Sequence, residues 1–214
     1  RAVGKRIEVD DFQVLQPWAL AALAALGRTT SDGRLFVHNS KLTSPSQFAA
    51  AMGLDNVLSG DEVRGEPEKG RTVKLCEVCT YEEIEPISEQ ISKLIISDAT
   101  TVGAEEYHDA DEVQKTIRYV LIEALRNVIQ HSEDPAGAVV LAQRMDKGPG
   151  YEQPFIQVGV VDCGIGVLES LRQTHTDITT PDVALERSLW PYYSGKFHSF
   201  QHGSAQNAGL GLFF

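Results

Sequence analysis

Three polar residues, Glu123, Asn127 and His131, follow one another at four-residue intervals in the stretch EALRNVIQH. Each residue turns an α-helix by about 100°, so side chains four residues apart lie on nearly one line. A carboxylate, an amide and an imidazole on one line can together transfer protons and exchange hydrogen bonds with a ligand. The alternative is that the stripe is only the solvated side of an amphipathic helix.

A second candidate segment, DCGIG, follows the apolar run FIQVGVV. Asp162 would be held at the end of a buried strand, where its carboxylate can accept hydrogen bonds. Gly164 and Gly166 allow a sharp backbone turn and let a ligand lie close to the main chain. A simple strand-to-helix turn would have the same residues, so this segment alone leaves both interpretations open.

The third candidate segment is NAGLGLFF, in which Gly209 and Gly211 flank Leu210. Glycines ahead of a helix can present backbone N–H groups to phosphates. The sequence has neither the GxxxxGK[ST] loop nor a GxGxxG that follows a strand, so the two most familiar nucleotide-binding motifs are not supported.

The elements that must position these residues can be predicted from periodicity and from cap residues. In the first sixty residues we expect a strand, a helix from Pro17 to Gly27, a buried strand, and a helix capped by Ser44 that ends at Gly53. The two strands are expected over residues 6–15 and 34–39.

The remainder of the chain predicts an order of strand, helix, helix, strand, strand after a Gly- and Pro-rich linker at 59–71. The first helix should begin near Pro86. The second should be capped by Asp109 or Asp111 and end at His131, with an apolar face of Val113, Ile117, Val120, Leu121, Ala124 and Val128. The strands should span 72–78, 138–145 and 155–162, in a mixed sheet that has helices on one face.

Composition narrows the classes of function. The net charge of −11 argues against nucleic-acid binding, which needs a basic surface. The apolar run WALAALAAL is too short to cross a bilayer, and there is no signal-peptide pattern, so we expect a cytoplasmic protein without a membrane partner. Cys76 and Cys79 form a CxxC without a second pair of ligands, which favours ordinary thiols over a zinc site.

Taken in order, the three segments resemble the motif set of the GHKL ATPase superfamily: ExxxNxxxH on a helix, DxGxG after a strand, and GLGL after a long loop. The resemblance covers about residues 80–214. It implies ATP and Mg²⁺ as ligands and a two-layer α/β sandwich of the GHKL (Bergerat) type. Because that fold continues beyond the GLGL motif, the resemblance also implies a C-terminally incomplete sandwich.

The resemblance also implies a role for each motif residue. Asp162 would accept a hydrogen bond from the adenine amino group, with Gly164 and Gly166 beside the base. Asn127 would bind the magnesium ion, and Glu123 would orient or deprotonate the attacking group. The phosphates would meet Gly209, Leu210 and Gly211, under a lid at about 174–206 that contains Gly195, Lys196, His198, His202 and Gly203.

His131 is similar to the version of the motif found in anti-sigma-factor serine kinases. Its imidazole is expected either to contact a phosphate or to stabilise the helix end, where positive charge is favoured.

The first sixty residues resemble a STAS-type domain, the small α/β fold of anti-anti-sigma factors. Pro17 stands where signalling members have a phosphorylated serine, so the resemblance implies partner docking rather than phosphorylation. The expected organisation is therefore α+β, with a STAS-like domain at 1–65, a linker and connecting strand at 66–80, and an ATP-binding domain at 81–214.

The function expected from these resemblances is an ATP-binding regulator with a protein partner, such as a sigma-factor regulator, and with homodimers as one option. It would either phosphorylate Ser or Thr on that partner or act as an ATP-driven switch. Two alternatives remain: a histidine kinase fragment, although no phosphoacceptor helix precedes the ATPase-like region, and an interaction module whose nucleotide site has decayed.

Overall fold

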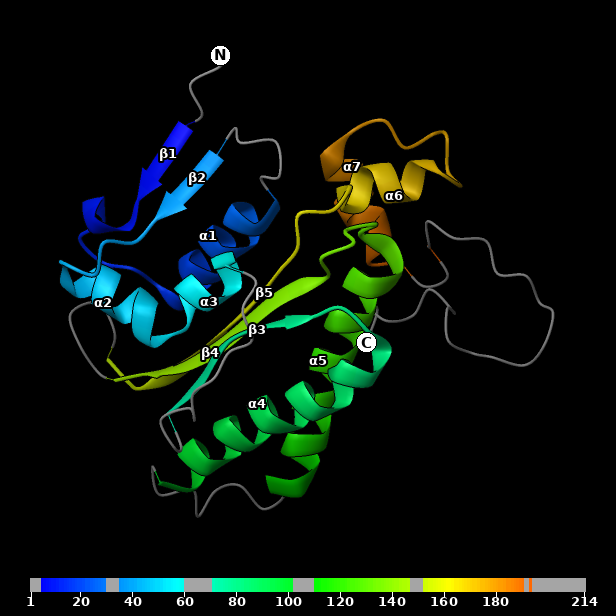
Figure 1. Cartoon of the computed structure of the whole chain (residues 1–214). Coiled ribbons are helices and arrows are strands. Elements are labelled where there is room, and N and C mark those ends of the chain that lie inside the picture. The colour runs from blue at the N-terminus through cyan, green and yellow to red at the C-terminus, as the bar shows by residue number, and fades with distance from the viewer. Residues whose placement is uncertain are drawn as a thin grey trace.

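The computed structural model describes residues 5–29, 35–59, 71–101, 110–146, 152–190 and 193. Within these ranges the chain is a mixed α+β fold (Figure 1), as predicted. A small parallel strand pair with its helices precedes a three-stranded antiparallel sheet, and further helices follow the sheet.

The front unit contains β1 (Lys5–Glu8), the 3-10 helix η1 (Val9–Asp11), α1 (Pro17–Thr29) and β2 (Leu35–His38). Strands β1 and β2 are parallel, which requires a crossover such as the one that α1 supplies. Helix α1 begins at the predicted Pro17.

The predicted strand at 6–15 is wrong in its length. Strand β1 ends at Glu8 because the carboxylate of Asp10 accepts hydrogen bonds from the backbone N–H and hydroxyl of Ser40 and from the N–H of Thr43. These long-range bonds favour a turn over a continued strand. The strand predicted at 34–39 is present as β2, in which Val37 packs against the core of the front unit and His38 is exposed.

Helix α2 (Ser44–Ala51) is capped one residue earlier than predicted. Thr43, rather than Ser44, is the N-cap, and it forms a reciprocal capping box with Ser46. Gly53 takes a φ of +91° after the helix, as its predicted role as a stop requires. A short helix, α3 (Leu54–Ser59), follows and was not predicted.

The sheet consists of β3 (Thr72–Val78), β4 (Ala138–Met145) and β5 (Phe155–Val161), in the order β3-β4-β5. The three predicted strand positions are correct. Both pairings are antiparallel, so the prediction of a mixed sheet is wrong for the described strands. The predicted hairpin of the last two strands is confirmed by the continuous β4–β5 register.

Two helices cover one face of this sheet, α4 (Tyr81–Thr101) and α5 (Ala110–His131). Their apolar side chains share a core with alternate sheet residues, including Ile91, Leu125 and Val140. Two of the predicted helix details are wrong. In α5, the predicted core residue Val120 is exposed, whereas Leu125 is fully buried. Helix α4 starts at Tyr81 rather than near Pro86, because the side chain of Glu83 accepts hydrogen bonds from the N–H groups that precede the helix. Asp111 lies inside α5 and does not cap it, while Asp109 lies outside the described residues.

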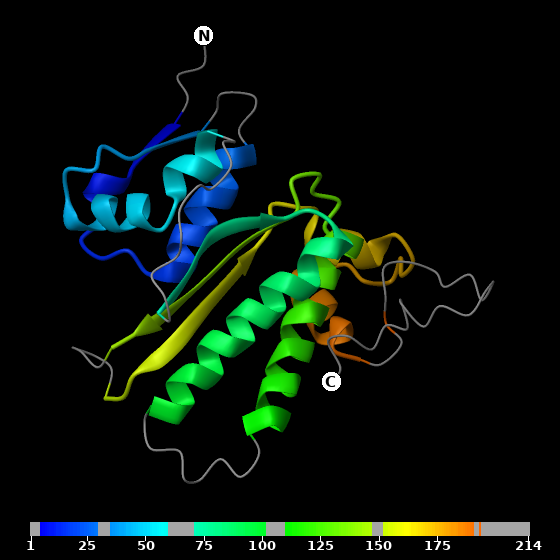
Figure 2. The same cartoon turned by 60° about the horizontal axis from the view of Figure 1, so that its bottom comes forward.

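Helix α1 covers the opposite face of the sheet, so the prediction of helices on one face only is wrong (Figure 2). Leu75, Val139 and Leu141 point away from α4 and α5 and join the core of the front unit. Gly159 of β5 makes the close packing possible, because a Cβ atom there would lie 3.2 Å from the Cβ of Ala21. The sheet is therefore the middle of three layers rather than one of two.

Candidate functional site

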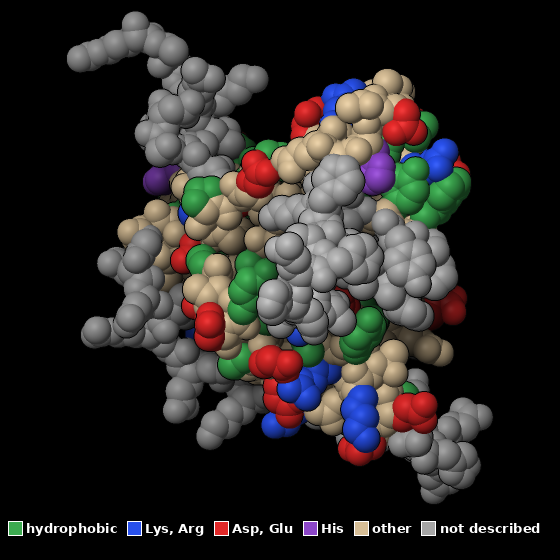
Figure 3. Space-filling view, turned by 90° about the vertical axis from the view of Figure 1, so that its right-hand side faces the viewer, with side chains coloured by type: hydrophobic (Ala, Val, Ile, Leu, Met, Phe, Trp, Pro, Cys, Tyr) green, Lys and Arg blue, Asp and Glu red, His purple; other side chains and the backbone are tan. Residues whose placement is uncertain are grey.

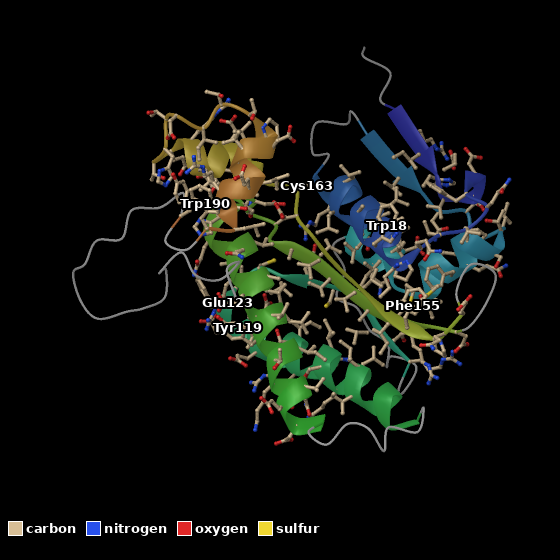
Figure 4. All side chains as sticks on the ribbon, turned by 180° about the vertical axis from the view of Figure 1, so that it is seen from behind. Trp18, Tyr119, Glu123, Phe155, Cys163 and Trp190 are labelled. Atoms are coloured by element: carbon tan, nitrogen blue, oxygen red, sulfur yellow. The ribbon has the colours of Figure 1, made fainter. Side chains whose placement is uncertain are left out.

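Helix α5 carries the predicted polar line along its length beside the buried positions that face the sheet. Glu123 is only 17% exposed, and its Oε1 accepts a hydrogen bond from Nη1 of Arg126 at 2.9 Å. Figure 4 shows Glu123 one helical turn from Tyr119 on α5. The carboxylate is thus held by a neighbour on its own helix.

Asn127 has a polar atom that the described structure does not satisfy. Its Nδ2 is buried and has no hydrogen-bond partner in the described part of the chain. A buried amide without a partner costs free energy of about 1–3 kcal/mol, although other described side chains, such as Ser88, also have such an atom. The Nδ2 group as placed can donate to a phosphate oxygen, whereas rotation of the amide by half a turn would present its oxygen, which suits a cation.

The loop 162–166 leads from β5 into α6 (Gly166–Arg172), and its three consecutive amides each have a different acceptor. The N–H of Cys163 donates to Oδ2 of Asp134 at 3.0 Å, and that of Gly164 donates to Oδ1 of Asp162 at 2.9 Å. The N–H of Ile165 donates to the carbonyl oxygen of Ser132 at 2.7 Å. These three hydrogen bonds fix the conformation of the loop. Asp162 still has its second carboxylate oxygen for a ligand.

Both glycines of this loop suit its backbone, and the sharp turn predicted from the sequence is present. A Cβ atom on Gly164 would lie 2.5 Å from the Cβ of Ser132 and closer still to its carbonyl oxygen. Gly166 takes a φ of +75° and has open space where a side chain would begin. The first glycine permits close contact and the second permits a left-handed turn.

Two of the three predicted segments therefore meet. Ser132 directly follows His131, the last residue of α5, so the loop 162–166 packs on the end of the helix that carries the polar line. The same turn is tied to the end of α6 by Gln173, whose Nε2 donates to Oε1 of Glu133 at 2.7 Å. Figure 4 shows Cys163 where β5 ends, above this end of α5.

The third segment, with Gly209, Leu210 and Gly211, lies outside the described residues, as do Gly195, Lys196, His198, His202 and Gly203 of the predicted lid. The part of the lid at 174–190 is described and contains α7 (Pro181–Ser188). Its small core consists of Leu171, Ile178 and Ala184.

Sequence reasoning missed a cluster of rings where the described lid ends. The guanidinium carbon of Arg187 lies 3.9 Å from the ring centre of Trp190, and His175 stacks on Tyr193 at 4.5 Å. These contacts hold residue 193 against α7 through cation–π and stacking interactions. The spacing of Arg187 and Trp190 by three residues was the available signal, but one such pair is common on helices.

Sequence reasoning also missed Arg28 and Asp134, which lie far apart in the sequence. Asp134 follows α5, and its carboxylate binds the backbone of both Cys163 and Ala136. An Asp whose carboxylate accepts the N–H of the residue two positions later forms a local turn, and such a turn can be predicted from sequence. Nothing local indicates its third neighbour, Arg28 of α1, whose Nη2 lies 3.8 Å from Oδ2.

Two of the three cysteines, Cys76 and Cys79, have thiols whose pKa is raised. Burial, with the nearby charges of Glu83 and Glu77, raises the pKa of Cys76 to about 12. Burial also raises the pKa of Cys79, whose Sγ donates to the carbonyl oxygen of Ala136 at 3.2 Å. Neither thiol is activated as a nucleophile. Within the described ranges, no three His, Cys, Asp or Glu side chains gather to hold a metal ion.

Charges on the outer face of α4 and α5 are paired rather than segregated. Arg118 of α5 forms ion pairs with Glu85 and Glu89 of α4. Figure 3 shows acidic and basic side chains intermixed in the lower part of this side of the molecule. No helix in the described part of the chain has both the length and the apolar character needed to cross a membrane.

Comparison with protein-family models, with curated proteins and with solved structures finds no match to this chain. The assignment of a function therefore depends on the residues and the geometry described above.

Proposed function

We propose that this chain is an ATP-binding regulatory protein whose Mg²⁺–ATP site is formed by the polar line of α5 together with the loop 162–166. The observation that carries the proposal is the contact of Gly164 and Ile165 with Ser132. It joins the residues proposed for the base to the helix proposed for the metal and the phosphates.

The proposed roles follow from the chemistry of three side chains. Asp162 would accept the adenine amino group, since one carboxylate oxygen is used by Gly164 and the other faces no hydrogen-bond donor among the described residues. Asn127 would use its unsatisfied amide at the triphosphate. His131 lies in the last turn of α5, where the helix dipole favours positive charge, and its imidazole would donate a hydrogen bond to a phosphate.

The fit of Asn127 to magnesium depends on its chemistry. Mg²⁺ in nucleotide sites is usually held by one or two protein oxygens with phosphates and waters completing the shell, so a single amide suffices. When bound, the cation neutralises charge on the phosphates, and Asn127 is the residue that would hold it. In the proposed kinase reaction, Glu123 would accept the proton of the attacking hydroxyl.

Calorimetry with Mg²⁺–ATP tests the binding step. The parent chain should bind, Asp162→Asn should bind at least about tenfold more weakly, and Asn127→Ala should lose a similar factor, as expected for hydrogen bonds to charged groups. Asp11→Asn and Asn56→Ala are matched controls in the front unit and should bind like the parent. Equal affinity in the parent, Asp162→Asn and Asn127→Ala would refute the proposal.

A protein-kinase activity and an ATP-driven switch would both use this proposed site. The ion pair of Glu123 with Arg126 favours the switch, because the carboxylate that should accept a proton is already engaged. Incubation with labelled ATP and host proteins separates the two, since only a kinase leaves label on a partner.

A further inference from the structure

Arg28, in the last turn of α1, reaches from the front unit to the turn that follows α5. Its Nη1 donates to Oε1 of Glu77 at 3.0 Å, and its Nη2 donates to the carbonyl oxygen of Gly137 at 2.9 Å. The same Nη2 lies 3.8 Å from Oδ2 of Asp134. The side chains of Arg28 and Asp134 are only 9% and 4% exposed, so this is a buried pair of opposite charges.

Asp134 connects this pair to the candidate nucleotide site. The oxygen that faces Arg28, Oδ2, also accepts the N–H of Cys163 at 3.0 Å, and Cys163 directly follows Asp162. The other oxygen accepts the N–H of Ala136 at 2.9 Å. A carboxylate this buried needs all of these partners, because removal of a cation from a buried pair leaves an uncompensated charge.

Helix α1 is well suited to transmit a displacement to this pair. It lies along β5, where Gly159 allows contact with Ala21, and the N–H of Trp18 at its first turn lies 3.3 Å from Oε1 of Gln157. Its last turn carries Arg28. The guanidinium is a rigid planar fork, so a shift of the helix would change its distances to all three acceptors together.

We infer that Arg28, acting through Asp134, is a positioning residue for the loop 162–166 and that the front unit regulates the nucleotide site by this route. The effect on the loop is inferred from contacts alone, whereas the effect on ATP rests on the proposed function. A partner that binds the front unit and displaces α1 would weaken the bond between Asp134 and Cys163, and with it the placement of Asp162. The coupling is reciprocal, so ATP would also change the affinity of the front unit for that partner.

Hydrogen exchange measured by NMR on the whole chain tests the effect on the loop without any ligand. In Arg28→Gln the amide of Cys163 should exchange about tenfold faster or more, the usual scale of such couplings, while amides of α2 keep their parent rates. Lys41→Gln is the matched control, because it breaks the Lys41–Asp55 ion pair of the same unit and touches nothing near the loop. In that variant the exchange of Cys163 should not change.

A second substitution shows whether the two residues act together. In the Asp134→Asn background, Arg28→Gln should add less than about twofold to the exchange of Cys163, because the charge that it serves is absent. Unchanged exchange in Arg28→Gln, or an equal increase in both backgrounds, would overturn the inference. If Arg28→Gln does not fold, Arg28→Lys replaces it in the test. A single ammonium nitrogen cannot reach all three acceptors of the guanidinium, so parent-like exchange of Cys163 in Arg28→Lys would also overturn the inference.

Affinity for Mg²⁺–ATP in the same variants tests the regulatory step. Arg28→Gln should bind about tenfold more weakly and Lys41→Gln should bind like the parent. If the parent itself does not bind ATP, the proposed function fails while the exchange result still decides the role of Arg28. Parent-like affinity in Arg28→Gln, with exchange increased, would overturn the regulatory part.

Discussion

Gly164 lies so close to Ser132 that a Cβ atom on the glycine would be 2.6 Å from the carbonyl carbon of the serine. This contact is between two stretches of backbone, so side-chain rearrangement cannot relieve it. It fixes the loop after β5 on the end of α5, and with it the relation between Asp162 and the polar line of the helix.

A matched pair of substitutions tests this contact. Gly164→Asn should lower the free energy of unfolding by about 3 kcal/mol, as for overpacking against a fixed backbone. Gly166→Asn should cost less than about 1 kcal/mol, since asparagine adopts a positive φ readily and the space there is open. Urea denaturation measures both, and equal losses would mean that the contact is not tight.

Replacement of Asn127 by leucine should separate stability from binding. Removal of a buried amide without a partner should raise the free energy of unfolding by about 1 kcal/mol while abolishing the affinity for ATP. The control Asn56→Leu in α3 should neither raise the free energy of unfolding nor abolish the affinity for ATP. A fall in stability for Asn127→Leu would show that its amide is satisfied in solution.

Glu123 and its partner Arg126 should have opposite effects on turnover. Glu123→Gln should bind ATP like the parent but lose any hydrolysis or transfer by about 10²–10⁴-fold, the scale for a positioned acid–base group. Arg126→Gln releases the carboxylate and should match or exceed the parent. Equal losses in both variants would indicate that the ion pair itself is needed.

Acid stability should depend on Asp10. Hydrogen bonds from Ser40, its largest influence, and from Thr43 hold the pKa of Asp10 well below its ordinary value of 3.8. The stabilisation is therefore present above pH 3.8 and is lost as the pH falls toward the folded-state pKa. Asp10→Asn should be less stable than the parent at neutral pH and should lose this acid dependence. The neighbouring Asp11→Asn should follow the parent curve.

Alkaline stability should depend on Cys76. Its thiol stays protonated in the folded chain up to a pKa of about 12, whereas in the unfolded chain it ionises near 9. Stability should therefore fall as the pH rises from 9 toward 12, and Cys76→Ala should reduce that fall. Native-state alkylation gives an independent check, because the exposed Cys79 should react before Cys76.

The elements with strong local signals could be predicted from sequence. Pro17 marks the start of α1, and the periodicity that ends at His131 marks α5. The end of β1 could not be predicted, because Asp10 lies in a turn that is stabilised by a hydrogen bond from Ser40, which lies in a loop distant in sequence. Local patterns do not contain such partners.

In the candidate site, too, the features with local signals could be predicted and those that depend on distant contacts could not. The four-residue spacing identified the polar line, and the glycines of DCGIG identified the turn, since both signals are local. The packing of α1 on the sheet was hidden because its small residues also suit an ordinary helix. Arg28 could not be paired with Asp134 for the same reason, since charge pairs between separate elements follow from the fold and not from spacing.

Because Gly159 packs closely against Ala21, the two halves of the chain cannot be used separately in protein engineering. A fragment that starts at β3 would present Leu75, Val139 and Leu141 to water, and it would aggregate rather than serve as an isolated ATPase domain. A chimera with a foreign front half would need an alanine-rich helix whose shape matches this face of the sheet.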